Sequence, residues 1–277
     1  MPQSVPLTQL PLDEVLEFFD WRMFYATWAV KEDESLKADA LKMLEDFSRN
    51  GGLSIRVATK FYNGRREGDD IVLEGGRRLP MLRQRVGKGL SLADFVGAAA
   101  PTPFGVFAAS VHTCGDLAAE RQQDGAYRQV RAGRCRCSQC EASYEPMLLR
   151  SVKVTLAEAV SCWIDAQLKK ELAGAGIEGM KIVKPAAGYA RCPDHTLKKD
   201  IMELIPDSDG LAIEFTESYA MIPDASICGL IFIHPEASYP EIRHLDKDSL
   251  DDYARRRGLD KEQCHRFLGY LLDGELG

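Results

Sequence analysis

The segment from Lys184 to Lys198 holds the residues whose types and spacing best suit the binding of a small polar ligand. It reads Lys-Pro-Ala-Ala-Gly-Tyr-Ala-Arg-Cys-Pro-Asp-His-Thr-Leu-Lys. Lys184 supplies a cation, and Gly188 predicts a tight turn whose backbone groups can approach a ligand because no Cβ stands in the way. Pro193 and Asp194 are typical of a helix start, whose positive N-terminal end would face the turn. The segment therefore predicts a polar ligand pocket.

The elements that position this segment follow from the spacing of apolar residues. It predicts helices at 36–47, 144–172, 194–204, 248–257 and 261–272, and strands at 54–61, 70–73, 103–111, 180–183, 211–216 and 227–234. The run 227–234 is apolar enough to lie at the centre of a sheet, and the aromatic-rich segment 12–30 is expected to be buried. No Gly-x-Gly-x-x-Gly follows a strand, which disfavours a Rossmann methyltransferase. We expect an α+β fold, one compact domain over 1–277 with a twisted, mostly antiparallel sheet and flanking helices.

Composition limits the class of protein. The chain has 277 residues, 45% of them hydrophobic and 28% charged, and a net charge of −7, which argues against nucleic acid or an anionic membrane as the main partner. No apolar run approaches the roughly 18–20 residues that cross a bilayer. The first twenty residues lack the basic and apolar regions of a signal peptide. We expect a cytoplasmic protein whose eight cysteines are thiols or ligands rather than a disulfide framework.

A cysteine cluster lies in an expected insertion loop at 125–143. Cys135, Cys137 and Cys140 have a spacing that suits zinc, with His112 or Cys114 as a fourth ligand. The spacing leaves three interpretations open: plain thiols on a loop, a zinc site, or a redox cluster or disulfide relay. No metal-binding residue is therefore assigned.

The segment that begins at Lys184 resembles the Arg-Pro-Ala-Pro-Gly-Tyr-Pro-Ala-Cys-Pro-Asp-His-Thr signature of the activation domain of cobalamin-dependent methionine synthase. Six further landmarks match that domain in the same order. They are Phe19-Asp20-Trp21 through Thr27-Trp28, Gly68 to Ile71, Ser91 to Val96, Leu156 to Ala159, Thr216 to Met221, and Asp252 to Arg256. The resemblance runs from about residue 10 to about residue 270, which is nearly the whole chain.

The resemblance implies a binding site for S-adenosylmethionine (AdoMet). Asp20 would hold the ligand's ammonium end or a nearby hydroxyl, and Glu158 is the second matched acidic residue. The remaining matched residues are Lys184, where the family has arginine; Ala186, Gly188 and Tyr189 of the turn; and Tyr239, the first of two closing tyrosines. Each has a plainer interpretation as well: a turn cap for Asp20, a solvated helix edge for Glu158, a surface charge for Lys184 and a rim aromatic for Tyr239.

Two departures from the family pattern bear on affinity. Lys184 offers a point charge where arginine has a planar fork, so about 1 kcal/mol of binding is expected to be lost. Pro240 replaces the second tyrosine. Nearby His195 is expected to satisfy the helix end, and Glu217 to be a structural carboxylate, so neither receives a catalytic role.

The function implied by the resemblance is reductive methylation of cob(II)alamin, which makes the chain a component of a methyltransferase. The Asp-x-His-x-x-Gly cobalamin motif is absent, so we expect a stand-alone activation subunit whose partners are a corrinoid-binding methionine synthase chain and a flavodoxin-like electron donor. The run Arg255 to Arg257 is a candidate basic patch for the donor, although a solvated helix face is the plainer interpretation and the one that we favour. Three alternatives remain: a non-catalytic docking or chaperone subunit, a reductive activator that uses a metal at the cysteines, and a subunit for another corrinoid methyltransferase.

Overall fold

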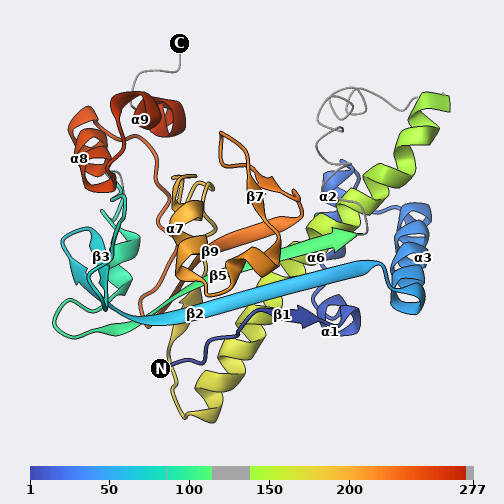
Figure 1. Ribbon diagram of the computed structural model, residues 1–277, viewed down its shortest axis with the longest axis horizontal. Helices are drawn as coiled ribbons and strands as arrows, with labels where there is room; N and C mark the ends of the chain where they lie inside the picture. Colours follow the sequence, from blue (N-terminus) through green and yellow to red (C-terminus); the bar gives the residue numbers. More distant parts are fainter. Residues whose placement is uncertain (86, 114–137, 273–277) are drawn as a thin grey trace.

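The computed structural model describes residues 1–85, 87–113 and 138–272, without the side chains of 138–143. A twisted sheet runs through the molecule in the order β4-β3-β2-β5-β9-β6, with β1 paired to β2 beside this path (Figure 1). Every pairing is antiparallel. The strands are β1 (Thr8–Leu10), β2 (Leu53–Glu67), β3 (Asp70–Leu73), β4 (Arg78–Pro80), β5 (Thr102–Thr113), β6 (Lys181–Val183) and β9 (Ser226–His234).

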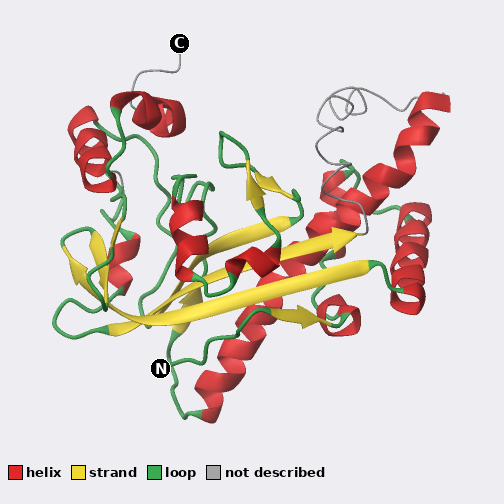
Figure 2. Cartoon of the chain, viewed as in Figure 1, coloured by secondary structure: helices red, strands yellow, loops and turns green. Residues whose placement is uncertain are grey.

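Helices flank this sheet, and a small hairpin stands apart from it (Figure 2). The α-helices are α1 (Leu12–Leu16), α2 (Trp21–Thr27), α3 (Glu34–Asn50), α6 (Ser138–Gly174), α7 (Leu197–Leu204), α8 (Lys247–Arg257) and α9 (Lys261–Leu268). The 3-10 helices are η1 (Leu92–Phe95), η2 (Ser208–Leu211) and η3 (Gly269–Leu271), and the hairpin pairs β7 (Glu214–Phe215) with β8 (Met221–Ile222).

The two faces of the sheet carry separate cores because successive side chains of a strand point to opposite faces. On β5, Phe107, Ala109 and Val111 belong to the core that α1, α2, α3 and α6 cover. Phe104 and Val106 belong to the core that α7 and η1 cover. A third, smaller core holds α8 and α9 together at one corner. The antiparallel α+β architecture predicted from the sequence is therefore confirmed.

The long helix α6 is the element that brings the candidate site to the sheet. Leu148, Val152, Leu156, Val160 and Ile164 recur every four residues, and all are buried on one face of the helix. This face packs against β5 and β9. The register of the buried stripe therefore fixes which polar residues of α6 stand at the edge of the sheet beside β6.

Most predicted elements are confirmed, with differences in their bounds. The helix expected at 261–272 ends at Leu268, where the 3-10 helix η3 follows. The helix expected at 194–204 begins only at Leu197, after a turn at His195 and Thr196. The Asp194 carboxylate accepts the Thr196 N–H within that turn and also bonds Tyr253 and Arg257 of α8. The strand expected at 211–216 shrinks to β7, since Ala212 adopts a left-handed φ of 50° and cannot be extended. The residue before Ala212 is the buried Leu211, which ends the 3-10 helix η2 instead.

Other expectations meet the limits of the described chain. No helix in the described ranges is both long and apolar enough to cross a membrane. Cys114, Cys135 and Cys137 lie outside the described residues, and the side chain of Cys140 is not described. Residues 138–143 of the expected insertion form the first part of α6. The thiols of Cys162, Cys192, Cys228 and Cys264 are free, as expected.

Candidate functional site

The turn after β6 is held by backbone hydrogen bonds to β9, which is an interior strand next to the edge strand β6 and not the central strand that the sequence predicted. Ala187 donates to the carbonyl of Cys228 at 3.1 Å, and Ala186 forms an isolated bridge with Gly229. The backbone of Gly188 has a φ of 91°, and a Cβ there would lie 2.6 Å from the His195 ring. Glycine is therefore required on two counts, conformation and space. Tyr189 follows and remains 61% exposed, so the turn presents a ring to solvent from a rigid base.

The side chain of Lys184 is buried and already has partners. Its ammonium donates to the hydroxyl of Ser161 at 2.9 Å and to the Ser161 carbonyl, and lies 3.1 Å from Oδ1 of Asp165. It also stands over the ring of Phe107 at 5.8 Å. Burial lowers the pKa of Lys184, and the Asp165 carboxylate opposes that shift. The interpretation of Lys184 as a plain surface charge is wrong, because only 4% of its side chain is exposed.

Glu158 is the carboxylate of α6 that has no partner. Its side chain is half-buried, and within the described part of the chain it accepts no hydrogen bond and joins no ion pair. Burial raises its pKa, while the charge of Lys184 lowers it. A half-buried carboxylate without a donor is costly. Glu158 is therefore poised to accept a donor or a cation from outside.

Asp20 lies near the same part of α6, at the start of α2. It is the N-cap of that helix, and its Oδ1 accepts the backbone N–H of Arg22 at 2.9 Å. Burial acts to raise the pKa of Asp20, but the hydrogen bonds from Arg22 and Met23 lower it. The capping role weighed from the sequence is confirmed. The carboxylate remains half exposed, at 47%, and so is open to a ligand.

The thiol of Cys162 lies within electrostatic range of four charged residues. Burial raises the pKa of this thiol, and Lys184 lowers it. The carboxylates of Asp165, Glu158 and Asp20 raise it further. Asp20, Glu158 and Lys184 thus each lie within electrostatic range of the same thiol on α6.

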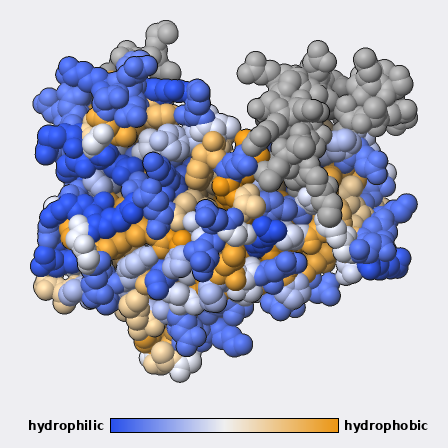
Figure 3. All heavy atoms as spheres, viewed as in Figure 1, coloured by the Kyte–Doolittle hydropathy of each residue, from blue (hydrophilic) through white to orange (hydrophobic). Residues whose placement is uncertain are grey.

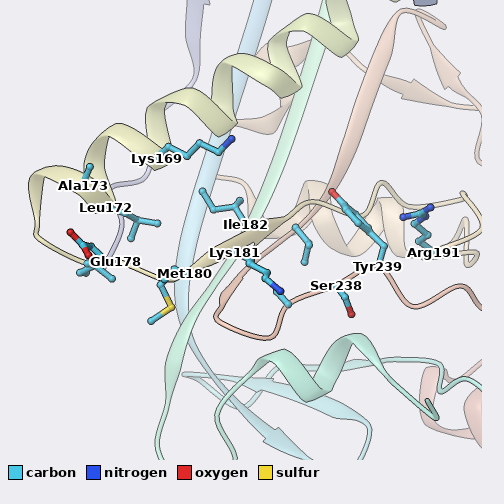
Figure 4. Close-up of a pocket in the computed structure, with 14 residues that line it drawn as sticks. Lys169, Leu172, Ala173, Glu178, Met180, Lys181, Ile182, Arg191, Ser238 and Tyr239 are labelled. Carbon is cyan, nitrogen blue, oxygen red and sulfur yellow. The ribbon is translucent and has the colours of Figure 1, made fainter. Parts of the chain in front are cut away.

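Tyr239 connects this group to an open cavity. Its hydroxyl accepts the backbone N–H of Lys184 at 3.0 Å, and the guanidinium of Arg191 stacks on its ring with 4.8 Å to the centroid. The cavity has a volume of about 740 Å³. It lies between the end of α6, strand β6 and the loop that carries Tyr239 (Figure 4). Its lining includes Lys169, Leu172, Met180, Lys181, Ile182, Arg191 and Tyr239.

The arginines proposed as a basic patch are mostly internal. Arg257 is 9% exposed and pairs with Asp194 and Asp200. Arg256 is 16% exposed and pairs with Asp70. Only Arg255, 73% exposed, faces solvent. This run is therefore neither a basic patch nor a solvated helix face, because Arg256 and Arg257 form ion pairs within the protein.

His195 has a structural position. Its ring packs against Gly188, and its Nδ1 lies 3.2 Å from the ammonium of Lys198. Burial and the charge of Lys198 lower its pKa. Glu217 is exposed in the hairpin between β7 and β8. Neither residue stands among the groups around α6.

Sequence reasoning missed three residues of this region. Ser161 and Asp165, which hold Lys184, follow Glu158 by three and seven residues, and this spacing places all three on one side of a helix. That spacing was a usable signal. Arg191 gave none, because nothing in the sequence showed that its guanidinium would stack on Tyr239.

The residues that the structure describes contain no cluster of three or more His, Cys, Asp or Glu that could hold a metal. His112, considered as a zinc ligand, is buried, and its Nε2 lies 2.9 Å from both the Ser110 hydroxyl and the Leu211 carbonyl. The zinc interpretation of the cysteines stays untested, since those residues lie outside the described ranges.

Comparison with known proteins identifies both a family and a similar solved structure. Residues 11–258 match a family model described as "Vitamin B12 dependent methionine synthase, activation domain". A solved structure described as "Crystal Structure of the MetH Reactivation Domain bound to AdoHcy" is similar, with a TM-score of 0.79 and 24% sequence identity. The match covers 98% of this chain and 90% of that one. At this identity the structural match shows a shared fold.

Proposed function

Because the chain belongs to the family of vitamin B12-dependent methionine synthase activation domains, we propose that it binds AdoMet and supports the reductive methylation of cobalamin. The similar reactivation domain was solved with AdoHcy, the molecule that AdoMet becomes when it gives up its methyl group. The proposed ligand lies at the edge of the sheet, where α6, the turn after β6 and Tyr239 meet.

The observation that carries this proposal is the unpartnered carboxylate of Glu158. The amino group of AdoMet is a cation with three N–H donors, which is the partner that a half-buried carboxylate lacks. Asp20 supplies a second, exposed carboxylate close enough to influence the same thiol, Cys162. The ring of Tyr189 and the backbone of Ala186 and Gly188 offer the aromatic surface and the close approach that an adenine requires. These residues therefore fit the ligand.

The protein's contribution to the reaction is positioning. When bound, AdoMet supplies its sulfonium methyl group, and the substrate cobalamin accepts that group after a one-electron reduction from Co(II) to Co(I). The leaving group is a neutral thioether, so no protein acid or base is needed. Residues of the turn and α6 hold the methyl donor in line and keep water away. The structural position of His195 agrees with this division of labour.

The partners follow from what the sequence lacks. It has no Asp-x-His-x-x-Gly motif, so we propose that cobalamin is carried outside these 277 residues, on a corrinoid-binding methionine synthase domain or chain. An external one-electron donor of the flavodoxin type completes the reaction. The free thiols of the described cysteines agree with the proposed cytoplasmic setting.

A second candidate function rests on Lys184. Its ammonium is taken up by Ser161 and Asp165, which leaves it no donor for a ligand carboxylate. If no other residue replaces it, AdoMet affinity is lost, and the chain acts as a non-catalytic docking subunit for a corrinoid protein. Retained binding of the corrinoid protein without AdoMet binding would identify this function.

Calorimetry distinguishes the two functions. Titration of AdoMet into the wild-type chain is expected to give saturable binding. Glu158→Ala and Asp20→Ala are each expected to weaken it by about tenfold, the effect of one lost charge-assisted hydrogen bond. Glu145→Ala, at an exposed carboxylate of α6, is the matched control and should bind as the wild type does. Absence of binding to the wild type, also with a corrinoid partner present, would reject AdoMet binding in favour of the docking function.

A further inference from the structure

Arg191 is a cation held in place without an anionic partner. Its guanidinium lies over the ring of Tyr239, 4.8 Å from the centroid. Across the described residues it makes no hydrogen bond and no ion pair, although it lines the 740 Å³ cavity. Figure 4 shows it beside Tyr239, across that ring from Lys169 and Leu172 of α6. A planar fork of donors at the wall of a cavity is suited to bind a carboxylate with two parallel hydrogen bonds.

The platform beneath Arg191 is itself rigid. The hydroxyl of Tyr239 is fixed by the backbone N–H of Lys184. The next residue, Pro240, is buried and has a restricted φ. A guanidinium stacked on a fixed ring loses little further conformational entropy when it binds a ligand, so the free-energy cost of ordering it is small. The replacement of an aromatic residue by Pro240 thus stiffens the support of Arg191.

The other cations near the site are less suitable. Lys184 is buried and committed to Ser161 and Asp165. Lys169 and Lys181 line the same cavity, but both are exposed and neither is stacked on a ring among the described contacts. A flexible ammonium must be ordered before it can bind an anion. Arg191 is the cation whose position is already set.

We propose that Arg191, supported by Tyr239, binds the carboxylate of the amino-acid end of AdoMet, and that Lys184 instead holds the turn to α6. This inference rests on the proposed function, since it assigns a residue to that ligand. Arg191 is a binding and specificity-determining residue: it distinguishes ligands that carry a carboxylate from those that do not. Arg191, seven residues after Lys184, would thus take the role of the arginine that the family has at position 184.

The test compares two ligands on matched variants. AdoHcy and its decarboxylated analogue differ only in the carboxylate, and calorimetry gives the affinity of each. The wild type should bind AdoHcy at least about tenfold more tightly, since it gains a charge-assisted bidentate contact. Arg191→Ala should bring this ratio close to one by weakening AdoHcy alone. Arg191→Lys, which keeps the charge but not the fork, should give an intermediate ratio. Lys169→Ala removes a charge from the same cavity and should leave the ratio unchanged.

Each outcome is decisive. If Arg191→Ala keeps the wild-type ratio, or weakens both ligands equally, the assignment of Arg191 is wrong, although AdoMet binding stands. If the ratio falls in Lys169→Ala instead, the carboxylate is bound by Lys169. If the wild type binds neither ligand, the proposed function fails and this inference fails with it. Thermal melts of the variants confirm folding, which is expected because Arg191 is exposed.

Discussion

The two ends of the sheet differ in how their charged groups are satisfied. At the β3–β4 end, Arg83 bonds Asp69 at 2.9 Å and Asp94 at 2.8 Å. Arg256 there bonds Asp70 at 2.6 Å. Hydrophilic residues predominate over this region, on the left of Figure 3. These ion pairs hold the loops at this end of the sheet together.

At the β6 end the pairing is incomplete. Lys184 is satisfied by Asp165 and Ser161, but Glu158 and Arg191 have no ionic partner among the described residues. The resemblance to the family drew on motifs at both ends, and motif matching alone could not separate them. From this difference we infer that the landmarks at the β3–β4 end stabilise the fold, and that the unpaired groups at the β6 end are available to the proposed ligand.

The largest effect on stability is expected when an arginine with buried ion-pair partners is removed. Arg257 donates to Asp194 at 3.1 Å and to Thr196 and Asp200 at 2.8 Å, with 1% of the Asp194 side chain exposed. Arg257→Ala leaves a buried carboxylate without its cation, so the free energy of unfolding should fall by about 3–5 kcal/mol in denaturant titrations. Arg255→Ala, at an exposed neighbour, should change it by less than about 1 kcal/mol. Equal effects would contradict a structural role for Arg257.

A smaller effect is expected in the turn of the ligand end. Gly188→Ala meets both a φ of 91° and the His195 ring at 2.6 Å, so a loss of about 2–3 kcal/mol of stability is expected. Gly258→Ala is the matched control, because Gly258 has a φ of 71° but a Cβ added there would meet nothing within 4 Å. It should cost about 1 kcal/mol, which isolates the contribution of the ring contact. A cost at position 188 no greater than at 258 would show that the turn is not tightly packed.

The mildest change concerns the pH dependence of binding. Burial raises the pKa of Glu158, so its carboxylate takes up a proton at a higher pH than an ordinary glutamate and loses its attraction for the ligand's ammonium. AdoMet affinity should therefore fall by several-fold as the pH is lowered through this pKa, while Glu158→Gln should bind more weakly and with a flatter pH profile. Calorimetry across the acidic range measures both. If AdoMet affinity had the same pH dependence in Glu158→Gln as in the wild type, Glu158 would not be part of the binding site.

Much of the fold could be predicted from the sequence, because it depends on local periodicity. The apolar spacing between Leu148 and Trp163 predicted the helix that is α6, and the apolar run of β9 predicted a strand inside the sheet. The true start of α7 could not be predicted, since Asp194 bonds Tyr253 and Arg257, which lie 59 and 63 residues further along the chain.

The candidate site was predictable only in part, for the same reason. The motif predicted the turn and its glycine, and the structure has both, with Gly188 at a φ of 91°. The partners of Lys184 and the stacking of Arg191 on Tyr239 depend on contacts between segments distant in sequence. Those contacts decide which cation is free, and no spacing rule reports them.

We propose that AdoMet binds at the β6 end of the sheet and not at the β3–β4 end. Hydrogen exchange of the backbone amides, measured with and without AdoMet, distinguishes the two ends. With AdoMet bound, we expect slower amide exchange in the turn 184–192, in the loop around Tyr239 and in α6 near Glu158. We expect no change in 69–85, 87–94 or α8. Unchanged exchange everywhere at saturating AdoMet, or protection confined to the arginine network, would contradict this proposal.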